Sequence, residues 1–378
     1  MRLRVATLNV WALPFGLARH TAPRMASIGA ALPALDSDVV ALQEVWTEEA
    51  RAVLVEAGRQ AGLVHRWHNQ GSVGGSGLLV LSRLPVVEAR FDPFGLRGLP
   101  ERVWHADYWS GKGFALLGLR TPEGPLALVD THLHAQYAEQ VGGEYDTHRM
   151  GQVVQLALAL TGVQVPLVAA GDFNLEEDQP HYSVLRGLTH LRDAAVEAGR
   201  RQATTLASSP YRRSGANERI DYVFVRDGAS RALRVRSIQR IFDESLRFAG
   251  EPGAPSDHAG LVADLEIVPS QRGPERTPDP RAIALARQEL QSGREAWLER
   301  GSGQRLAGGA VLAGGGLAIV SARRPALSRR GFLRGLLVSG GLLALPAGIG
   351  LGALSELAGR REVEALDALL RDLDALGT

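Results

Sequence analysis

A carboxylate and an amide directly follow a short apolar segment near the middle of the chain. Residues 166–170 read PLVAA, Gly171 follows, and Asp172 and Asn174 stand two positions apart. Such a run is typical of a strand buried on both faces, and side chains at i and i+2 of an extended segment point the same way. We therefore expect Asp172 and Asn174 to lie side by side at a strand end, where open α/β sheets bind ligands. A plain turn is the alternative interpretation.

Polar side chains of the same kinds stand at the ends of five other predicted strands. In chain order they are Asn9, Glu44, His132, Asp221 and the adjacent pair Asp257 and His258. Carboxylate and amide oxygens suit a hard cation, Mg²⁺ or alternatively Mn²⁺. Histidine beside aspartate suits acid–base activation of a water molecule. Together these residues predict metal-assisted hydrolysis of a phosphate ester.

The elements that must position these side chains alternate along the segment 1–268. Apolar runs and period-two patterns predict strands at 2–10, 38–46, 78–81, 114–119, 126–132, 166–170, 219–225 and 261–268. Apolar residues at helical spacing predict helices at 22–35, 47–62 and 146–161. This mixture of strands and helices places the chain in the α/β class.

Composition excludes several kinds of chemistry. The 378 residues include no cysteine, which rules out disulfides, thiol catalysis and zinc–thiolate sites. Residues 1–268 carry 27 basic and 30 acidic side chains, whereas residues 269–378 carry 15 and 11. An acidic catalytic part argues against a groove for nucleic acid. Of the 42 basic residues only Lys112 is a lysine, which makes it a candidate for a specific task.

Two neighbouring segments allow more than one interpretation. Residues 91–113 are rich in aromatic side chains, glycine and proline, which fits either ordinary core packing or a loop at a membrane interface. His132 and His134 share one face at the end of a predicted strand, and two histidines there favour a functional role over a structural one.

In this order the motifs resemble the DNase I-like endonuclease/exonuclease/phosphatase superfamily. The matching pieces are Leu8-Asn9-Val10-Trp11, Gln43-Glu44-Val45, Thr131-His132, Gly171-Asp172-Phe173-Asn174, Ile220-Asp221-Tyr222 and Ser256-Asp257-His258. The resemblance implies a four-layer α/β sandwich, with two packed β-sheets flanked by helices, over residues 1–268. Within the superfamily the chain looks most like the membrane-bound neutral sphingomyelinases. The stretches 8–14, 44–46, 107–112 and 131–137 and the hydrophobic C-terminal region carry that closer similarity.

The resemblance also implies roles for individual residues. Glu44 would be the principal metal ligand, with Asn9 beside it and Asp257 completing the metal region. His258 would be the general base, oriented by Asp221. Asp172 and Asn174 would position the water or the phosphate, and His132 would donate to a phosphoryl oxygen. Asp107 and Lys112 match the spacing of an aspartate–lysine switch next to the active site of neutral sphingomyelinases.

The C-terminal segment 269–378 reads as an appendage of three parts. Residues 269–305 form a proline-rich linker followed by a helix, 306–354 form a hydrophobic membrane region, and 355–378 form an amphipathic tail. The uncharged run at 335–354 is long enough to span a bilayer, whereas the run at 306–320 is rich in glycine and too short to span it comfortably. Arginines just before residue 335 favour one span with a cytoplasmic catalytic domain, and a two-span hairpin is the alternative.

The sequence therefore predicts a Mg²⁺-dependent phosphodiesterase that releases a phosphocholine-like product from sphingomyelin or a related (lyso)phospholipid. As an appendage, residues 301–378 should be dispensable for hydrolysis of detergent-dispersed lipid. Two alternatives remain, a DNase I-like nuclease or phosphatase acting on nucleic acid or phosphoinositide, and an inactive membrane-anchored binding protein. The acidic balance argues against nucleic acid as the partner.

Overall fold

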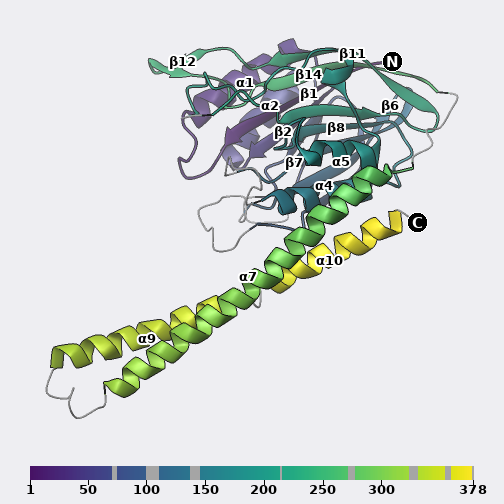
Figure 1. The fold of residues 1–378 in the computed structure, drawn as a ribbon. Helices are drawn as coiled ribbons and strands as arrows, with labels where there is room; N and C mark the ends of the chain where they lie inside the picture. Colours follow the sequence, from purple (N-terminus) through teal and green to yellow (C-terminus); the bar gives the residue numbers. More distant parts are fainter. Residues whose placement is uncertain are drawn as a thin grey trace.

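Two six-stranded mixed β-sheets packed face to face form the centre of the molecule (Figure 1). The structure is a computed structural model that describes residues 1–69, 75–98, 110–136, 145–212, 215–270, 277–322, 331–353 and 359–376. In each sheet one central pair is parallel, β1 with β2 and β7 with β8, and all the other pairs are antiparallel.

The first sheet contains the N-terminal strand. Its strands, in spatial order, are β11 (Arg231–Ile241), β14 (Gly260–Pro269), β1 (Arg2–Ala12), β2 (Val39–Val45), β4 (Leu79–Ser82) and β3 (His65–His68). The β1–β2 and β1–β14 pairings bring together strands from the start and the end of the catalytic part. The sheet therefore forms completely only when both ends of the catalytic part have folded.

The second sheet contains the strand that precedes Asp172. Its order is β5 (Val86–Pro93), β6 (Gly113–Thr121), β7 (Gly124–His132), β8 (Leu167–Asp172), β10 (Asp221–Arg226) and β9 (Arg192–Asp193). All six residues of β8 are buried, as the apolar run predicted. A separate hairpin of β12 (Leu246–Phe248) and β13 (Glu251–Gly253) stands beside the sheets.

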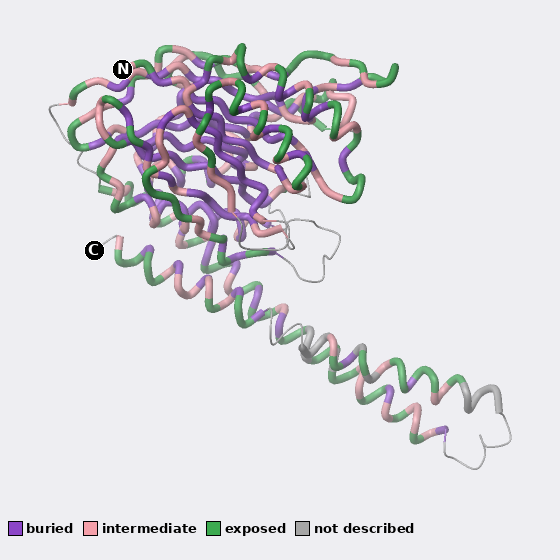
Figure 2. Tube along the Cα trace, turned by 180° about the vertical axis from the view of Figure 1, so that it is seen from behind, coloured by how far each residue is buried: buried purple, intermediate pink, exposed green. Residues whose placement is uncertain are grey.

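Helices cover the outer face of each sheet and make a four-layer arrangement. On the first sheet lie α1 (Thr21–Leu35) and α2 (Glu48–Gln60), and on the second lie α4 (Asp146–Leu160) and α5 (Pro180–Thr189). Thr47 caps α2 by accepting a hydrogen bond from the Ala50 N–H, and acidic residues occupy its first turn. One apolar core lies between the sheets and one between each sheet and its helices. Figure 2 shows this concentration of buried residues in the central layers.

The predicted fold is confirmed in its central part, two packed sheets flanked by helices. Each of the eight strands and three helices predicted for residues 1–268 corresponds to an element of the structure. Several elements were not predicted, namely β3, β5, β9, β11, β12, β13, α5 and α6 (Ala194–Glu197). The shortest of them carry no periodicity, and β5 and β11 are edge strands whose mostly half-buried or exposed residues form no apolar run.

The C-terminal helices differ from the predicted arrangement. The structure has one 42-residue helix, α7 (Pro280–Ser321), where a linker helix and a separate apolar segment were expected. Its first half packs on the domain, and α9 (Gly331–Ala353) then runs back along its second half in a projecting hairpin (Figure 1). We call residues 302–321 together with α9 the arm. The last helix, α10 (Gly359–Leu376), returns along the first half of α7 to the domain.

The tail is amphipathic, as predicted, and its apolar side is buried. Leu366, Leu369 and Leu373 are buried in the same core cluster as side chains of α4, and Ala286 and Leu290 of α7 join them. The division of the chain at residue 268 remains a prediction. The packing nevertheless argues against the expectation that residues 301–378 are a dispensable appendage, because α10 completes part of that core.

The prediction of a membrane-spanning helix at 335–354 is not supported. Within the described ranges, no helix combines the length and the apolarity needed to cross a bilayer. Glycines, Ser339 and Pro346 interrupt the leucine pattern of α9. The helix packs closely on α7 instead, since a side chain at Gly341 would lie 2.5 Å from Ile319 Cγ1.

Candidate active site

The predicted residues meet where the central strands of both sheets end. Across the parallel β7–β8 pair His132 lies opposite Asp172, and across the antiparallel β8–β10 pair Asp172 lies opposite Asp221. Asn9 of β1 pairs with Gln43 of β2, next to Glu44. Because the sheets are stacked, these two sets of strand ends face one another.

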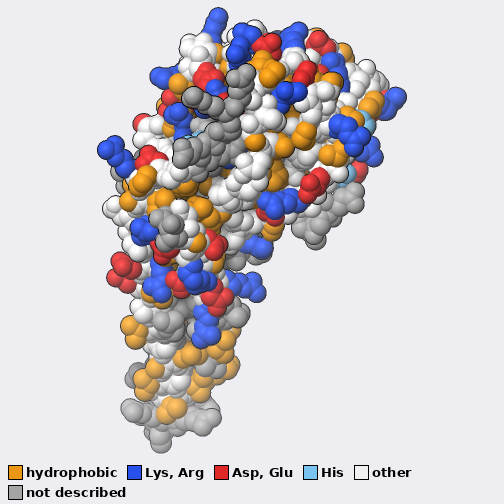
Figure 3. All heavy atoms as spheres, turned by 90° about the vertical axis from the view of Figure 1, so that its right-hand side faces the viewer, with side chains coloured by type: hydrophobic (Ala, Val, Ile, Leu, Met, Phe, Trp, Pro, Cys, Tyr) orange, Lys and Arg blue, Asp and Glu red, His pale blue; other side chains and the backbone are white. Residues whose placement is uncertain are grey.

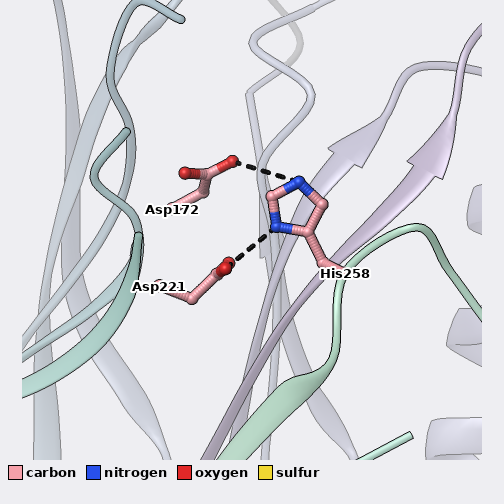
Figure 4. A group of neighbouring side chains, drawn as sticks. All are labelled: Asp172, Asp221 and His258. Atoms are coloured by element: carbon pink, nitrogen blue, oxygen red, sulfur yellow. Dashed lines mark hydrogen bonds and ion pairs between the residues drawn. The ribbon is translucent and has the colours of Figure 1, made fainter. Parts of the chain in front are cut away.

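His258 lies between two buried aspartates (Figure 4). Its Nδ1 is 2.9 Å from Asp221 Oδ2, and its Nε2 is 3.9 Å from Asp172 Oδ2. Ser256 supports this loop, because its hydroxyl donates to the Asn9 carbonyl at 2.6 Å and accepts the His258 N–H at 3.3 Å. Asp221 therefore fixes the imidazole orientation and leaves Nε2 pointing at the centre of the site.

The charges of this group shift one another's pKa values. Burial alone would lower the pKa of His258, but the nearby carboxylates of Asp221, Asp172 and Asp257 raise it well above its usual value. Burial and the neighbouring Asp221 carboxylate raise the pKa of Asp172 to about 7. Large pKa shifts in a cluster of buried, interacting groups are typical of catalytic sites.

Glu44 and Asn9 form the other side of the cluster. The Asn9 Nδ2 donates to Glu44 Oε1 at 3.0 Å and to Asp172 Oδ2 at 2.9 Å. Burial, and then the nearby Asp257, raise the pKa of Glu44 to about 6. Its Oε2 is buried and has no hydrogen-bond partner among the residues that the structure describes. An unpartnered buried carboxylate oxygen beside further hard oxygens fits a divalent cation.

A second position for a cation is offered by the histidine and its aspartates. Ligand atoms of Asp172, Asp221 and His258 all lie within 4.8 Å of one another. We favour the position at Glu44, because Nδ1 of His258 is already hydrogen-bonded to Asp221.

His132 and Lys112 form a buried pair at the end of β7. The Lys112 Nζ lies 2.9 Å from His132 Nε2 and donates to the Leu133 carbonyl at 2.8 Å. His132 Nε2 lies 3.5 Å from Asp172 Oδ2 and 4.0 Å from Glu44 Oε1. The only lysine of the chain therefore stands within the cluster, at the edge of the two carboxylates.

The last residues of β8 and the turn that follows it set the positions of Asp172 and Asn174. A side chain at Gly171, where φ is +144°, would place its Cβ 2.1 Å from the Thr131 carbonyl, so only glycine allows β8 to lie this close to β7. Asn174 has a positive φ of 48°, and its Nδ2 donates to the Leu133 carbonyl at 2.9 Å. The predicted side-by-side placement differs in detail, because the Asn174 amide faces the β7 end.

Some predicted residues lie elsewhere. Asp107, and Trp109 of the aromatic stretch 91–113, fall outside the described residues. Phe94 of the aromatic stretch is buried in the core, as its structural interpretation expected. His134 does not share the position of His132. Its ring stacks on Tyr145, with 4.0 Å between the ring centroids, and faces the interior of the domain.

Sequence reasoning missed Arg24. This side chain is fully buried, and its guanidinium donates to the carbonyls of Val10, Trp11 and Pro255. It therefore ties the segment after Asn9 to the loop that precedes His258. An arginine within a helical pattern normally indicates solvent, so nothing local could have identified it.

Comparison with known proteins gives a family and several relatives. The model of the Endonuclease/Exonuclease/phosphatase family matches residues 6–258. A candidate neutral sphingomyelinase of Drosophila melanogaster is 31% identical over 276 residues, which are 71% of this chain and 61% of that protein. Sphingomyelin phosphodiesterase 2 of Homo sapiens is 30% identical over 320 residues, 80% of this chain and 73% of that protein. The inositol phosphosphingolipids phospholipase C of Schizosaccharomyces pombe is 31% identical over 200 residues, 51% and 46% of the two chains. The chain thus spans less than two thirds of the Drosophila relative.

Solved structures share the fold. Sphingomyelinase C from Streptomyces griseocarneus has a TM-score of 0.54 and 21% identity, over 70% of this chain and 99% of that one. A beta toxin from Staphylococcus aureus with bound magnesium ions has a TM-score of 0.54 and 17% identity, with the same shares of the two chains.

Proposed function

The chain belongs to the Endonuclease/Exonuclease/phosphatase family, and from this premise we propose that it is a divalent-metal-dependent phosphodiesterase acting on a lipid. Its substrate is the head-group phosphodiester of sphingomyelin or of a related (lyso)phospholipid. The names of its relatives support this class, because they include sphingomyelin phosphodiesterase 2 and an inositol phosphosphingolipids phospholipase C.

One observation carries the proposal. An oriented histidine, an unpartnered carboxylate oxygen and a buried lysine–histidine pair converge on a single cluster from both sheets. A water-activating group, a cation position and a source of positive charge are what hydrolysis of a phosphodiester requires. A binding protein would not need a histidine whose tautomer is fixed by a buried aspartate.

In the proposed reaction His258 acts as the general base. Asp221 accepts the Nδ1–H, which leaves the Nε2 lone pair to take a proton from the attacking water. The new bond joins the water oxygen to phosphorus, and the bond from phosphorus to the lipid oxygen breaks. The products are a phosphorylated head group and the lipid alcohol, which recovers the proton.

The remaining residues stabilise charge and hold the cation. In the free protein His132 Nε2 accepts from the Lys112 ammonium, and His132 donates to a phosphoryl oxygen as negative charge develops once the substrate has replaced that contact. Asn174 and Asp172 orient the water or the phosphate. Glu44, Asn9 and Asp257 would hold Mg²⁺, or alternatively Mn²⁺. When bound, the cation would polarise the phosphoryl group and offset the carboxylate charges that raise the pKa of His258.

We further propose that two surfaces contact the lipid bilayer. The turn after β1 displays Phe15 at 97% exposure and Leu17 at 64%, and Phe15 has a φ of +58°. An aromatic side chain that is both fully exposed and conformationally strained is costly for the free protein, which supports a role in binding an apolar surface.

The arm is the second proposed lipid contact. It carries several exposed apolar side chains (Figure 3), namely Leu306, Leu317, Val320, Leu336, Leu342, Leu343 and Ile349. In Figure 1 the arm projects away from the catalytic domain. We propose that the arm attaches the protein to the membrane surface. The cytoplasmic placement of the catalytic domain remains a prediction.

A substrate panel tests the proposal. Purified protein is incubated with Mg²⁺, Mn²⁺ or EDTA and with sphingomyelin, an inositol phosphosphingolipid, lysophosphatidylcholine, phosphatidylcholine or plasmid DNA, and His258→Ala is the control. We expect release of a phosphorylated head group from at least one lipid, abolished by EDTA and by the substitution. Cleavage of DNA with no lipid turnover would replace the proposal with the nuclease alternative, and inactivity toward all substrates would favour a binding protein.

A further inference from the structure

A carboxyl group from the C-terminal helix is buried in the catalytic domain. Glu362 lies in the first turn of α10 and is only 5% exposed. Its Oε1 accepts a hydrogen bond from the Arg97 backbone N–H at 3.2 Å, and its Oε2 lies 3.7 Å from His148 Nε2 of α4. Because a carboxyl group is seldom buried without a partner, this contact calls for an explanation.

The surroundings of Glu362 are aromatic and apolar. The His148 ring is 5.4 Å from the Tyr145 ring and 6.1 Å from the Trp297 ring of α7, in edge-on contacts. Within the described part of the chain, neither ring nitrogen of His148 nor Glu362 Oε2 has a hydrogen-bond partner. Leaving these atoms without partners lowers the stability of the fold. The one hydrogen bond that Glu362 makes in compensation is the one to the Arg97 N–H of the 94–98 segment.

That segment is connected to the active site through Gln152. The Gln152 Nε2 donates to the Leu96 carbonyl at 3.0 Å, and its Oε1 accepts the His134 N–H at 2.8 Å. The neighbouring Leu133 carbonyl accepts hydrogen bonds from both Lys112 and Asn174. A continuous path of hydrogen bonds and backbone therefore runs from α10 to two side chains of the site.

The His134 ring also packs directly against the 94–98 segment. Gly98 has a φ of +110°, and a side chain there would place its Cβ 2.9 Å from His134 Nε2. The 94–98 segment and the 133–134 segment are therefore in direct contact, so a displacement of the first must be taken up by the second.

We propose that Glu362 is a positioning residue for the active site. By accepting the Arg97 N–H, Glu362 of α10 fixes the 94–98 segment. Through Gln152 and His134 it also fixes the Leu133 carbonyl, which orients Lys112 and Asn174. Lys112 and Asn174 would act in the same way on any phosphodiester, so this positioning role does not depend on the proposed lipid substrate. It also connects α10 to the site.

The protonation state of the pair fits this role. Burial raises the pKa of Glu362 to about 8, and the Arg97 N–H and charge lower it by less. Burial, and then the nearby His134, lower the pKa of His148 to about 3. At neutral pH an uncharged acid thus faces an uncharged imidazole. Glutamine, which has the same shape and keeps the accepting oxygen, should replace Glu362 without loss.

Four full-length variants test the proposal, namely Glu362→Gln, Glu362→Ala, Gln152→Leu and the exposed neighbour Glu364→Ala on the same helix. Two quantities are measured: kcat and KM on the most active substrate, and hydrogen exchange of the Arg97 and His134 amides. We expect Glu362→Ala to lower kcat at least tenfold with little change in KM and to speed exchange at both amides. Glu362→Gln and Glu364→Ala should resemble the parent.

The exchange measurement needs no substrate, so it separates this proposal from the proposed function. Combining Glu362→Ala with Gln152→Leu should lower kcat no further than the larger single effect, because both act on one path. Unchanged exchange and kcat in Glu362→Ala, or an equal loss in Glu362→Gln, would overturn the positioning role. If Glu362→Ala does not fold, Glu362→Asp shortens the same contact by one methylene, and unchanged exchange at Arg97 and His134 in that variant would overturn it equally.

Discussion

At the scale of single residues, Glu44 has both an unfavourable backbone conformation and an unfavourably buried carboxylate. This residue combines a φ of +59° with a buried carboxylate whose Oε2 lacks a hydrogen-bond partner within the described ranges. A non-glycine residue in this region typically costs about 1–3 kcal/mol, and a buried carboxylate oxygen without a hydrogen-bond partner adds a further cost. The protein keeps both penalties, which is expected where a ligand would relieve them.

The first prediction concerns that carboxylate. Glu44→Gln should lower kcat on the order of 100-fold or more and weaken Mg²⁺ binding, because a charged hard-oxygen ligand is lost. Without metal the variant should be at least as stable as the parent, since it no longer buries a carboxylate. Calorimetric Mg²⁺ titration and urea unfolding measure the two effects, with the exposed Glu49→Gln as control. Normal activity in folded Glu44→Gln would reject the metal assignment.

The second prediction concerns the size and charge of Lys112. Its ammonium is buried between His132 Nε2 and the Leu133 carbonyl, and an arginine fork occupies a different volume. Lys112→Arg keeps the charge and should lower kcat about tenfold through misplacement, whereas Lys112→Met keeps the length and should lower it through loss of charge. Steady-state kinetics with a water-soluble phosphodiester compare the two. A fully active arginine variant would contradict the specific use of lysine.

At the scale of elements, the sequence predicted strand ends better than it predicted contacts between helices. An apolar run bounded by a polar residue is a local pattern, so Asp172 and Glu44 after their runs and Asp221 before its run could be located from the sequence alone. The partners of α10 are set by tertiary packing alone, because its leucine spacing defines an apolar face without saying what that face covers.

The same limit applies to buried charges. Arg24, His148 and Glu362 look like ordinary polar positions on helices in the sequence, and only the fold shows that each is buried. His134 differed from its prediction for the related reason that β7 ends at His132, after which the side-chain alternation no longer applies.

The third prediction concerns the contact between α4 and α10. Between pH about 4.5 and about 8 the folded state binds the Glu362 proton more tightly than the unfolded state, so this residue makes stability fall as pH rises. His148 acts oppositely between pH about 3 and about 6.5, because folding keeps it neutral and stability rises with pH. Glu362→Gln should remove the fall, and His148→Asn the rise.

Urea midpoints measured from pH 4 to pH 9 give the difference from the parent, which we expect to amount to roughly a few kcal/mol at the extremes. Working with differences removes the contributions of Asp172 and Glu44, whose pKa values are also raised. A Glu362→Gln curve parallel to that of the parent over the whole range would show that folding does not raise the pKa of Glu362.

At the scale of the whole molecule, the residues that precede and follow the arm lie close together. The ion pairs Arg287–Asp374 and Arg294–Asp367 place α10 antiparallel to the first half of α7. Gly359 consequently lies beside Trp297, in a small cavity that Gly301 also lines. A few residues are enough to join position 301 to position 359.

The fourth prediction uses this geometry. Replacing residues 302–358 with a short glycine–serine linker should keep α10 and leave hydrolysis of detergent-dispersed substrate within about twofold, while vesicle binding falls at least tenfold. Deleting 301–378 should instead cost several kcal/mol, because it removes Leu366, Leu369 and Leu373 from the core. Thermal unfolding and vesicle co-sedimentation of both variants check this. Equal stability of the two would show that α10 packs without consequence.

Because Lys112 is both the only lysine and buried in the active site, amine-specific reagents can probe that site selectively. With no other lysine in the chain, amine acylation can modify only this side chain and the α-amino group of Met1, and endoproteinase Lys-C has one cleavage site. Since Lys112 is 6% exposed, its acylation rate should report how often the site opens. A substrate analogue or Mg²⁺ that closes the site should slow that rate while Met1 reacts as before. Rapid, ligand-independent labelling of Lys112 would mean that the Lys112 side chain is accessible in solution.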